Sequence, residues 1–333
     1  MSEIEIDEGL RHELKAAWHR FVDLVEPERP LLHRYCRRLT GNVWDAEDLV
    51  QDTILRAFGT LGKLDYAVRS PRAYLYRLAT NGWIDALRRR RTAESAVLDL
   101  PKKSHDSAAA GTVRDAATEL MTQLAPQERA AVLLKDAIGM SLDEIAEILG
   151  TTQGAIKSAL HRGRKRLRDA DPETEPGRAA PSAVLLDRFV AAYNAADIEA
   201  LTALVLENAT VEMLGCMFQA GPEARKGDKS WFQGALGGHP EWPTAFHFES
   251  QRAERAAFKR EPIVLIFRTR SGKEALESVL RLEEEDGMIR LLRVYAFCPE
   301  TTREVAAELG LDVRTGPYRY PTPAPGKSYV DET

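Results

Sequence analysis

Cysteine is scarce in this chain of 333 residues, and long apolar runs are missing. Cys36, Cys216 and Cys298 lie far apart and form no C-x-x-C pair, which argues against a zinc site or a disulfide framework and indicates a reducing compartment. No run approaches the roughly 18 apolar residues of a membrane span. The acidic N-terminal segment lacks the apolar stretch of a signal peptide. We therefore predict a cytoplasmic protein that makes no membrane contact and holds no metal or cofactor.

The net charge of −5 conceals an asymmetry along the sequence. Residues 1–170 carry +2, whereas residues 171–333 carry −7. The basic residues of the first part are clustered, above all at Arg88–Arg91 and Lys157–Arg168. Such clusters set the local potential that a nucleic acid meets, which net charge does not report. A chain of this length is expected to hold two or three domains.

The segment Ser141–Arg168 has the features of a helix-turn-helix. Ser141 followed by Glu144 predicts a capping box, and Gly150 stands where a turn requires positive φ. The second helix begins at Thr152. A solvated basic face would explain its charges, but not the polar residues at its start. The outward residues have the layout of a recognition helix in a major groove: Thr152, Gln153, Lys157, Ser158, His161, Arg162, Arg164 and Arg166.

A second basic segment, residues 70–91, combines aromatic, amide and arginine side chains on one predicted helix. Basic groups neutralise phosphate, and aromatic faces stack unpaired bases, so the combination favours holding an opened DNA strand. In the alternative interpretation Tyr74 and Trp83 are core residues, and the arginines only make the helix end soluble. The candidate residues are Arg72, Tyr74, Arg77, Asn81, Trp83, Arg88, Arg89, Arg90 and Arg91.

The predicted helix over residues 45–61 presents acidic and amide side chains beside an apolar stripe. An acidic face repels DNA and suits a protein partner. A plain solvated surface explains it equally well from composition alone. The candidate partner-binding residues are Asp45, Asp48, Leu49, Gln51 and Asp52.

Composition also suggests where the domains begin and end. Helices are expected over residues 9–92 and 114–170, with linkers over 93–113 and 171–181. From residue 182, two helices precede strand-like runs at 210–214, 245–251, 263–269, 275–283 and 289–297. Hairpin signals stand at Ser271-Gly272 and Asp286-Gly287. We expect an α+β domain with an antiparallel meander over residues 182–299, then a short helix and a proline-rich tail over 300–333.

Residues 30–92 and 114–168 resemble the two conserved units of extracytoplasmic-function (ECF) sigma factors of the sigma-70 family. The run from Asp45 to Phe58 resembles the region 2 helix that docks on core polymerase. Tyr74–Arg91 resembles the segment that melts and reads the −10 element, and residues 124–168 resemble region 4, which reads the −35 element. The resemblance implies a non-enzymatic factor that binds core RNA polymerase and promoter DNA and directs promoter-specific DNA-templated transcription initiation.

Residues 182–299 resemble SnoaL-like domains of the nuclear-transport-factor-2-like superfamily, in which helices form a cone over a curved sheet. The two resemblances together imply a multidomain fold, with two all-α sigma domains (a region 2 helical bundle and a region 4 helix-turn-helix) followed by an α+β SnoaL-like cone. The fusion implies regulation in cis, through intramolecular docking or a small ligand. Candidate cone-pocket residues are Tyr193, Trp231, His247 and Glu249.

Two alternatives remain at this point. The first is a SnoaL-like isomerase or hydrolase fused to a DNA-binding module, which requires a titratable group inside the cone. The second is a stand-alone repressor, which would have no use for the acidic face over residues 45–52.

Overall fold

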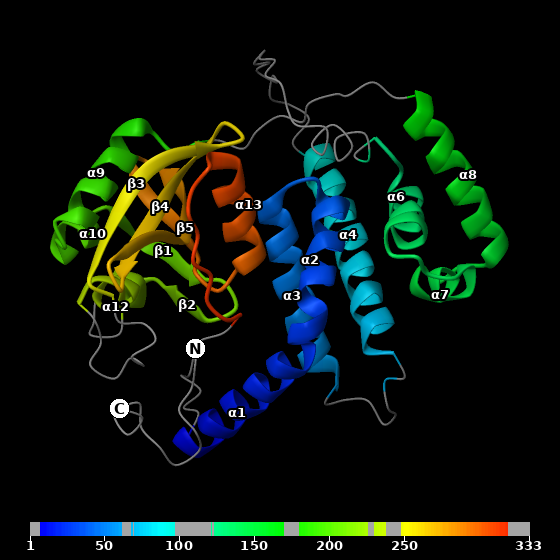
Figure 1. Ribbon diagram of the computed structural model, residues 1–333, viewed down its shortest axis with the longest axis horizontal. Coiled ribbons are helices and arrows are strands. Elements are labelled where there is room, and N and C mark those ends of the chain that lie inside the picture. The colour runs from blue at the N-terminus through cyan, green and yellow to red at the C-terminus, as the bar shows by residue number, and fades with distance from the viewer. Residues whose placement is uncertain are drawn as a thin grey trace. The chain divides into compact units, whose positions relative to one another are not determined.

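The computed structural model describes residues 7–61, 68, 70–96, 121, 123–169, 180–225, 230–237 and 248–318. The chain divides into two compact units, Met1–Pro176 and Gly177–Thr333, which Figure 1 shows with their elements labelled. Each unit has its own apolar core. The first unit is helical throughout its described part, and the second combines helices with a single sheet.

The helices of the first unit follow the predicted apolar stripes closely. In chain order they are α1 (Glu8–Val25), the short 3-10 turn η1 (Glu26–Glu28), α2 (Arg29–Thr40), α3 (Val43–Leu61), α4 (Pro71–Ala96), α6 (Pro126–Val132), the π-helical η2 (Leu133–Ala137), α7 (Leu142–Ile148) and α8 (Gln153–Asp169). Buried side chains from α1–α4 and from α6–α8 form one continuous cluster. Arg129 of α6 strengthens this packing, because its Nε donates to the Arg38 carbonyl of α2 at 3.1 Å.

One acidic residue of α3 lies inside the bundle. The Glu47 carboxylate is fully buried, accepts hydrogen bonds from Arg29 at 2.5 Å and Gln51 at 2.9 Å, and lies 3.6 Å from His33 Nε2. A buried carboxylate is tolerated only when it is paired and hydrogen-bonded. Glu47 therefore belongs to the scaffold, although the sequence places it within the acidic run Asp45–Asp52.

The second unit is a six-stranded sheet with helices on both sides. Its helices are α9 (Ala183–Asn194), α10 (Ile198–Ala203), α11 (Pro222–Arg225), α12 (Trp231–Gly237) and α13 (Pro299–Leu309). Its strands are β1 (Val205–Met213), β2 (Met217–Ala220), β3 (Ser250–Phe258), β4 (Glu261–Arg270), β5 (Lys273–Glu285) and β6 (Met288–Tyr295), in the order β2-β1-β6-β5-β4-β3. α9, α10 and α12 contribute to the core cluster on one face, and α13 lies on the other side of the sheet (Figure 1).

The sheet is mixed rather than wholly antiparallel. β3 to β6 form the expected antiparallel meander, but β1 pairs with β6 in parallel. The predicted hairpin turns are confirmed, because Ser271, Gly272, Asp286 and Gly287 all have positive φ. The strand expected over 245–251 instead runs over Ser250–Phe258, and residues 245–247 lie outside the described residues.

A carboxylate whose side chain is 10% exposed also organises the second unit. Glu277 of β5 accepts from Arg270 at 2.7 and 3.0 Å and from Arg314 at 2.8 Å, and Arg268 lies 3.6 Å away. Arg314 belongs to the segment after α13, where Val313 forms a parallel bridge with Leu276. Burial alone would raise the pKa of Glu277, but the hydrogen bonds from Arg270 and Arg314 outweigh it and lower the pKa.

Glu277→Gln should destabilise the second unit by roughly 2 kcal/mol at pH 7, because several arginines lose the carboxylate that they share. Since the folded-state pKa is lowered, this contribution is present above about pH 4.5 and is lost as the pH falls through the folded value. Hydrogen exchange of β4 and β5 at pH 7 and pH 3 measures both effects. If the pH dependence of exchange were the same in the wild type and in Glu277→Gln, the prediction would be contradicted. Glu254→Gln, which removes an exposed carboxylate, serves as the control.

Candidate nucleic-acid interface

The turn between α7 and α8 is built by local side-chain bonds. Ser141 and Glu144 form the predicted reciprocal capping box at the start of α7, and Gly150 adopts a φ of +59° in the turn. The Thr152 hydroxyl then accepts the Ala155 amide at 3.2 Å and caps α8. These residues direct the start of α8 away from α7, as the sequence predicted.

The inner side of α8 lies very close to α6. Ile156, Ala159, Leu160 and Gly163 are buried on this side. A β-carbon at Gly163 would lie 2.9 Å from Val132 Cγ2, closer than real β-carbon contacts. The packing therefore fixes which residues of α8 face outward.

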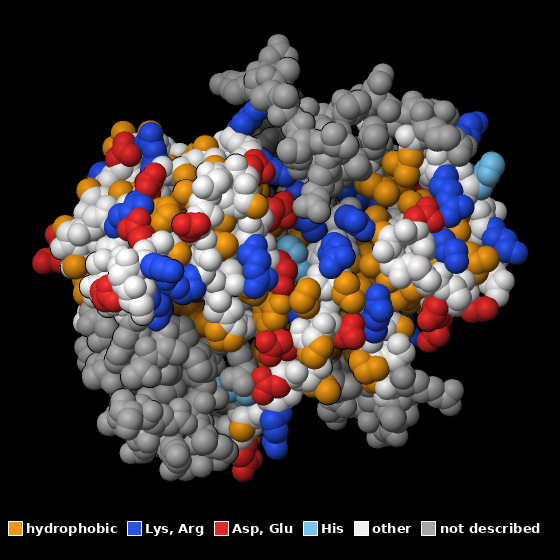
Figure 2. Space-filling model, viewed as in Figure 1, with side chains coloured by type: hydrophobic (Ala, Val, Ile, Leu, Met, Phe, Trp, Pro, Cys, Tyr) orange, Lys and Arg blue, Asp and Glu red, His pale blue; other side chains and the backbone are white. Residues whose placement is uncertain are grey.

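The outward side of α8 is polar and cationic. Figure 2 shows Lys and Arg side chains gathered over this helix. Lys157, Ser158, His161 and Lys165 are exposed there, and the sequence reasoning missed Lys165 although it shares their helical face. Gln153 also lies at the start of α8, but its amide is hydrogen-bonded to Asp143 of α7.

The three predicted arginines of α8 lie along its two edges and are held by carboxylates. Glu128 of α6 accepts from both Arg162 and Arg166, each at 2.8 Å. On the other edge Asp136 accepts two bonds from Arg164, and the hydrogen bonding raises the pKa of that guanidinium. The arginines are thus oriented by the protein, whereas Lys157 and Lys165 extend into solvent.

The predicted strand-binding residues of α4 divide between two sides of that helix. Tyr74 and Arg77 pack together, with the guanidinium 5.5 Å from the ring centroid, and Asn81 and Arg88 are exposed at helical spacing from them. Arg89 is exposed as well, while Arg72 lies 5.8 Å over the Tyr76 ring and 4.0 Å from Glu28. The side chains of Arg90 and Arg91 lie outside the described residues.

Trp83 lies on the opposite side of α4 from Asn81 and is only 6% exposed. Its ring joins the core, and the Arg129 guanidinium lies 5.5 Å from its centroid. The alternative interpretation of Trp83 as a core residue is confirmed, and its ring offers no face to an unpaired base because tertiary packing covers it.

The acidic helix α3 presents a narrower outward face than expected. Asp52 is exposed, 3.5 Å from Arg56, and Asp48 is half-buried. Asp45 is also half-buried and closes a reciprocal bond pair with Asn42 at the helix start. Leu49 packs in the core and the Gln51 amide binds Glu47. The prediction that these two side chains point outward toward a partner is therefore wrong. Leu55, 53% exposed, lies one turn from Asp52 on the same face and was missed.

The candidate cone-pocket residues of the second unit have different surroundings among the described residues. Tyr193 and Trp231 are core residues, and the Tyr193 hydroxyl donates to Gln251 at 2.9 Å. Burial raises the pKa of Tyr193 to about 12, which keeps the phenol protonated. Glu249 is exposed and accepts the Gly272 amide at 3.2 Å. His247 lies outside the described residues.

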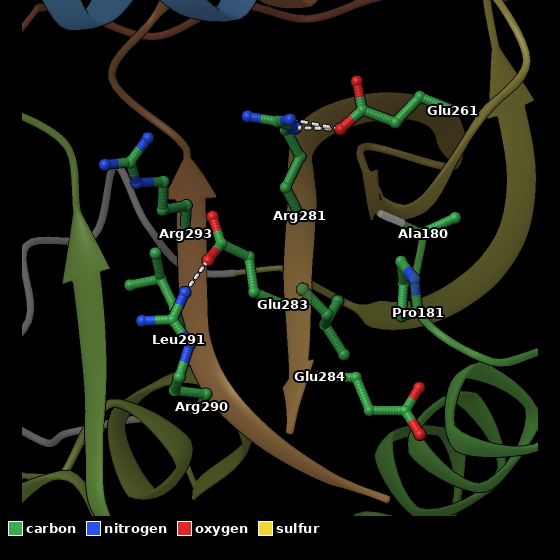
Figure 3. A pocket seen from close by; sticks show the side chains of 10 residues that line it. Ala180, Pro181, Glu261, Arg281, Glu283, Glu284, Arg290, Leu291 and Arg293 are labelled. Atoms are coloured by element: carbon green, nitrogen blue, oxygen red, sulfur yellow. Dashed lines mark hydrogen bonds and ion pairs between the residues drawn. The ribbon is translucent and has the colours of Figure 1, made fainter. Parts of the chain in front are cut away.

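A cavity of about 220 Å³ opens over β4, β5 and β6, beside residues 180–181 (Figure 3). Its ionic lining is balanced in charge: Arg281, Arg290, Arg293, Glu261, Glu283 and Glu284. Arg281 binds Glu261 and Arg290 binds Glu283. These internal pairs satisfy much of the lining, so the cavity does not indicate a charged ligand.

Within the described part of the chain, no three His, Cys, Asp or Glu side chains gather closely enough to hold a metal ion. No helix among those residues has both the length and the apolar character to cross a bilayer.

Comparison with known proteins shows which family models match the helical unit. The model of Sigma-70 region 2 matches residues 24–93, and that of Sigma-70, region 4 matches residues 114–167. The RNA polymerase sigma-E factor of Streptomyces coelicolor is 33% identical over 150 residues, which cover 45% of this chain and 84% of that protein. The chain belongs to the ECF sigma factors of the sigma-70 family. Region 2 thus includes α2, α3 and most of α4, and region 4 includes α6 to α8.

Other similarities extend further along this sigma factor. The ECF RNA polymerase sigma factor SigG of Mycobacterium tuberculosis is 34% identical over 226 residues, covering 57% of this chain and 60% of SigG. The chain thus spans about three fifths of that relative. The crystal structure of the M. tuberculosis ECF sigma factor SigJ is 19% identical, with a TM-score of 0.31, and covers 85% of this chain and 98% of that one.

Trp83→Ala should destabilise region 2 by about 3–5 kcal/mol, because it removes a buried indole from the core. Hydrogen exchange of α2, α3 and α4 measures the loss. Asn81→Ala, at an exposed position on the same helix, should change stability by no more than about 0.5 kcal/mol. Undiminished protection in Trp83→Ala would restore the base-stacking interpretation.

Proposed function

We propose that this chain binds core RNA polymerase and directs it to promoters with two separate recognition elements. The observation that carries the proposal is the ordered pair of sigma regions together with the exposed cationic face of α8. Region 4 would read the −35 element in the major groove with the start and outward face of α8. Region 2 would capture the opened −10 element with α4.

Within α8, the lysines supply charge and the edge arginines supply direction. Lys157 and Lys165 are flexible point charges suited to phosphate, and His161 lies between them on the exposed face. Thr152 and Ser158 add hydroxyl groups near the helix start, where base edges are reached. Arg162, Arg164 and Arg166 flank this row.

The α4 surface suited to an opened strand consists of Tyr74, Arg77, Asn81 and Arg88. Arginine supplies phosphate contacts, the Tyr74 ring supplies a stacking face and Asn81 supplies an amide for a base edge. The burial of Trp83 removes it from this set in the conformation described.

Core polymerase would bind the outward face of α3. Asp48 and Asp52 supply negative charge there, and the exposed Leu55 adds an apolar contact between them and the end of the helix. An apolar residue ringed by charges is typical of protein interfaces.

The second unit is proposed to be a SnoaL-like domain that regulates the sigma regions in cis. The packing of α9, α10 and α12 over one face of a six-stranded mixed sheet supports this assignment. Covalent linkage raises the effective concentration of such a domain to the millimolar range, so weak docking would suffice for regulation. The truncation described below tests this part of the proposal.

Lys165→Ala should reduce the slope of log affinity against log salt for duplex DNA by about one, because one phosphate contact is lost. Arg164→Ala should reduce the slope by less, since Asp136 already neutralises that guanidinium. Binding titrations at several salt concentrations measure both slopes. An unchanged slope for Lys165→Ala would remove the outward face of α8 from the DNA interface.

Run-off transcription with core polymerase tests the whole proposal. Wild type should give a promoter-specific transcript, and Asp48→Ala should require several-fold more protein because polymerase binding is weakened. Glu13→Ala, which removes an exposed carboxylate from α1, is the matched control. A chain ending at Asp169 should change transcript yield if the second unit regulates in cis. Absence of any specific transcript from genomic fragments would contradict the function, and equal yields from both chains would contradict only the regulation.

A further inference from the structure

Glu128 occupies an unusual position for a carboxylate in a DNA-binding unit. Its side chain is only 5% exposed, and each of its oxygens accepts a different arginine of the recognition helix. Oε1 accepts Arg162 Nε and Oε2 accepts Arg166 Nη1, both at 2.8 Å. These distances are those of strong charge-assisted hydrogen bonds.

The position of this carboxylate is set by the backbone. Glu128 lies in the first turn of α6, and a β-carbon at Gly163 would lie 3.5 Å from Glu128 Cβ. Because α6 and α8 approach this closely, the Glu128 side chain emerges directly beside the edge of α8 that carries both arginines. Helical spacing places Arg162 and Arg166 one turn apart on that edge.

The two arginines retain donors for a second partner. Arg162 uses Nε toward Glu128, which leaves its two Nη groups, and Arg166 uses Nη1, which leaves Nε and Nη2. Both side chains remain more than half exposed, at 56% and 54%. Two guanidinium groups on one carboxylate leave a net charge of +1, whereas the Arg164–Asp136 pair on the other edge is neutral.

We propose that Glu128 is a positioning residue that makes Arg162 and Arg166 a preformed clamp for one DNA phosphate. The phosphate supplies the second negative charge that this cluster lacks. Since the clamp is fixed to the α6–α8 contact, it sets the register of α8 in the groove and thereby sharpens sequence discrimination. The inference rests on the proposed −35 recognition by α8.

Glu128→Gln provides the test, because it keeps the shape and removes the charge. The probes are a duplex selected by the wild-type protein from a random pool and a scrambled duplex of the same composition. The variant should bind the scrambled duplex more tightly and lose discrimination about tenfold, the size of one charge-assisted hydrogen bond. Glu13→Gln is the control, since it removes an exposed carboxylate from α1, outside both proposed DNA-binding helices.

Methylphosphonate substitution of single phosphates locates the clamp. At one position, the methylphosphonate should weaken DNA binding by the wild type strongly. The same substitution should weaken binding by Glu128→Gln and Arg162→Ala much less, because each of these variants has already lost part of the clamp that contacts this phosphate. Thermal unfolding checks that the variants are folded.

Equal changes in affinity for both duplexes in Glu128→Gln would overturn the inference, since they indicate a simple charge effect or a purely structural one. The inference would also be overturned if each methylphosphonate weakened DNA binding by Glu128→Gln as much as it weakens binding by the wild type. Failure of wild type to select any duplex would instead overturn the proposed function.

Discussion

At Gly163, helix α8 comes so near α6 that a side chain there would overlap Val132. This contact fixes the rotation of α8 about its axis and so decides which residues reach outward. Lys157, His161 and Lys165 occupy the exposed arc, while Glu128 of α6 can reach only one edge of the helix. The recognition surface therefore depends on a residue that makes no contact with a ligand.

Carboxylates that are largely shielded from solvent and contact more than one basic side chain recur in both units. Glu47 binds Arg29 and lies near His33, and Glu277 binds Arg270 and Arg314. Desolvation makes an isolated buried charge very costly, so each carboxylate holds its partners in fixed positions. In region 2 this fixes α2 against α3, and in the second unit it fixes the segment after α13 against β5. Such networks favour one arrangement over alternatives more than they add stability.

Local chemistry was predictable from the sequence, and long-range packing was not. The Ser141–Glu144 capping box, Gly150 and two hairpin turns follow from residue type and spacing alone. The turn between β3 and β4 was missed because Lys259 and Arg260 adopt positive φ without a glycine signal. The parallel pairing of β1 with β6 joins residues about 80 positions apart, for which no short pattern exists.

Predictions of individual site residues were wrong where helical phase or a buried partner determined the direction of a side chain. Leu49 and Trp83 face the core, and Gln51 turns inward because the buried Glu47 needs a donor. The charge pattern predicted the exposed cationic face of α8, but it did not distinguish the lysines of this helix from its arginines. Their environments separate them, because Lys157 and Lys165 extend into solvent while Arg162 and Arg166 share Glu128. A flexible ammonium adds affinity at little geometric cost, whereas an oriented guanidinium adds direction. Strength of DNA binding and its register would therefore depend on different residues of the same helix.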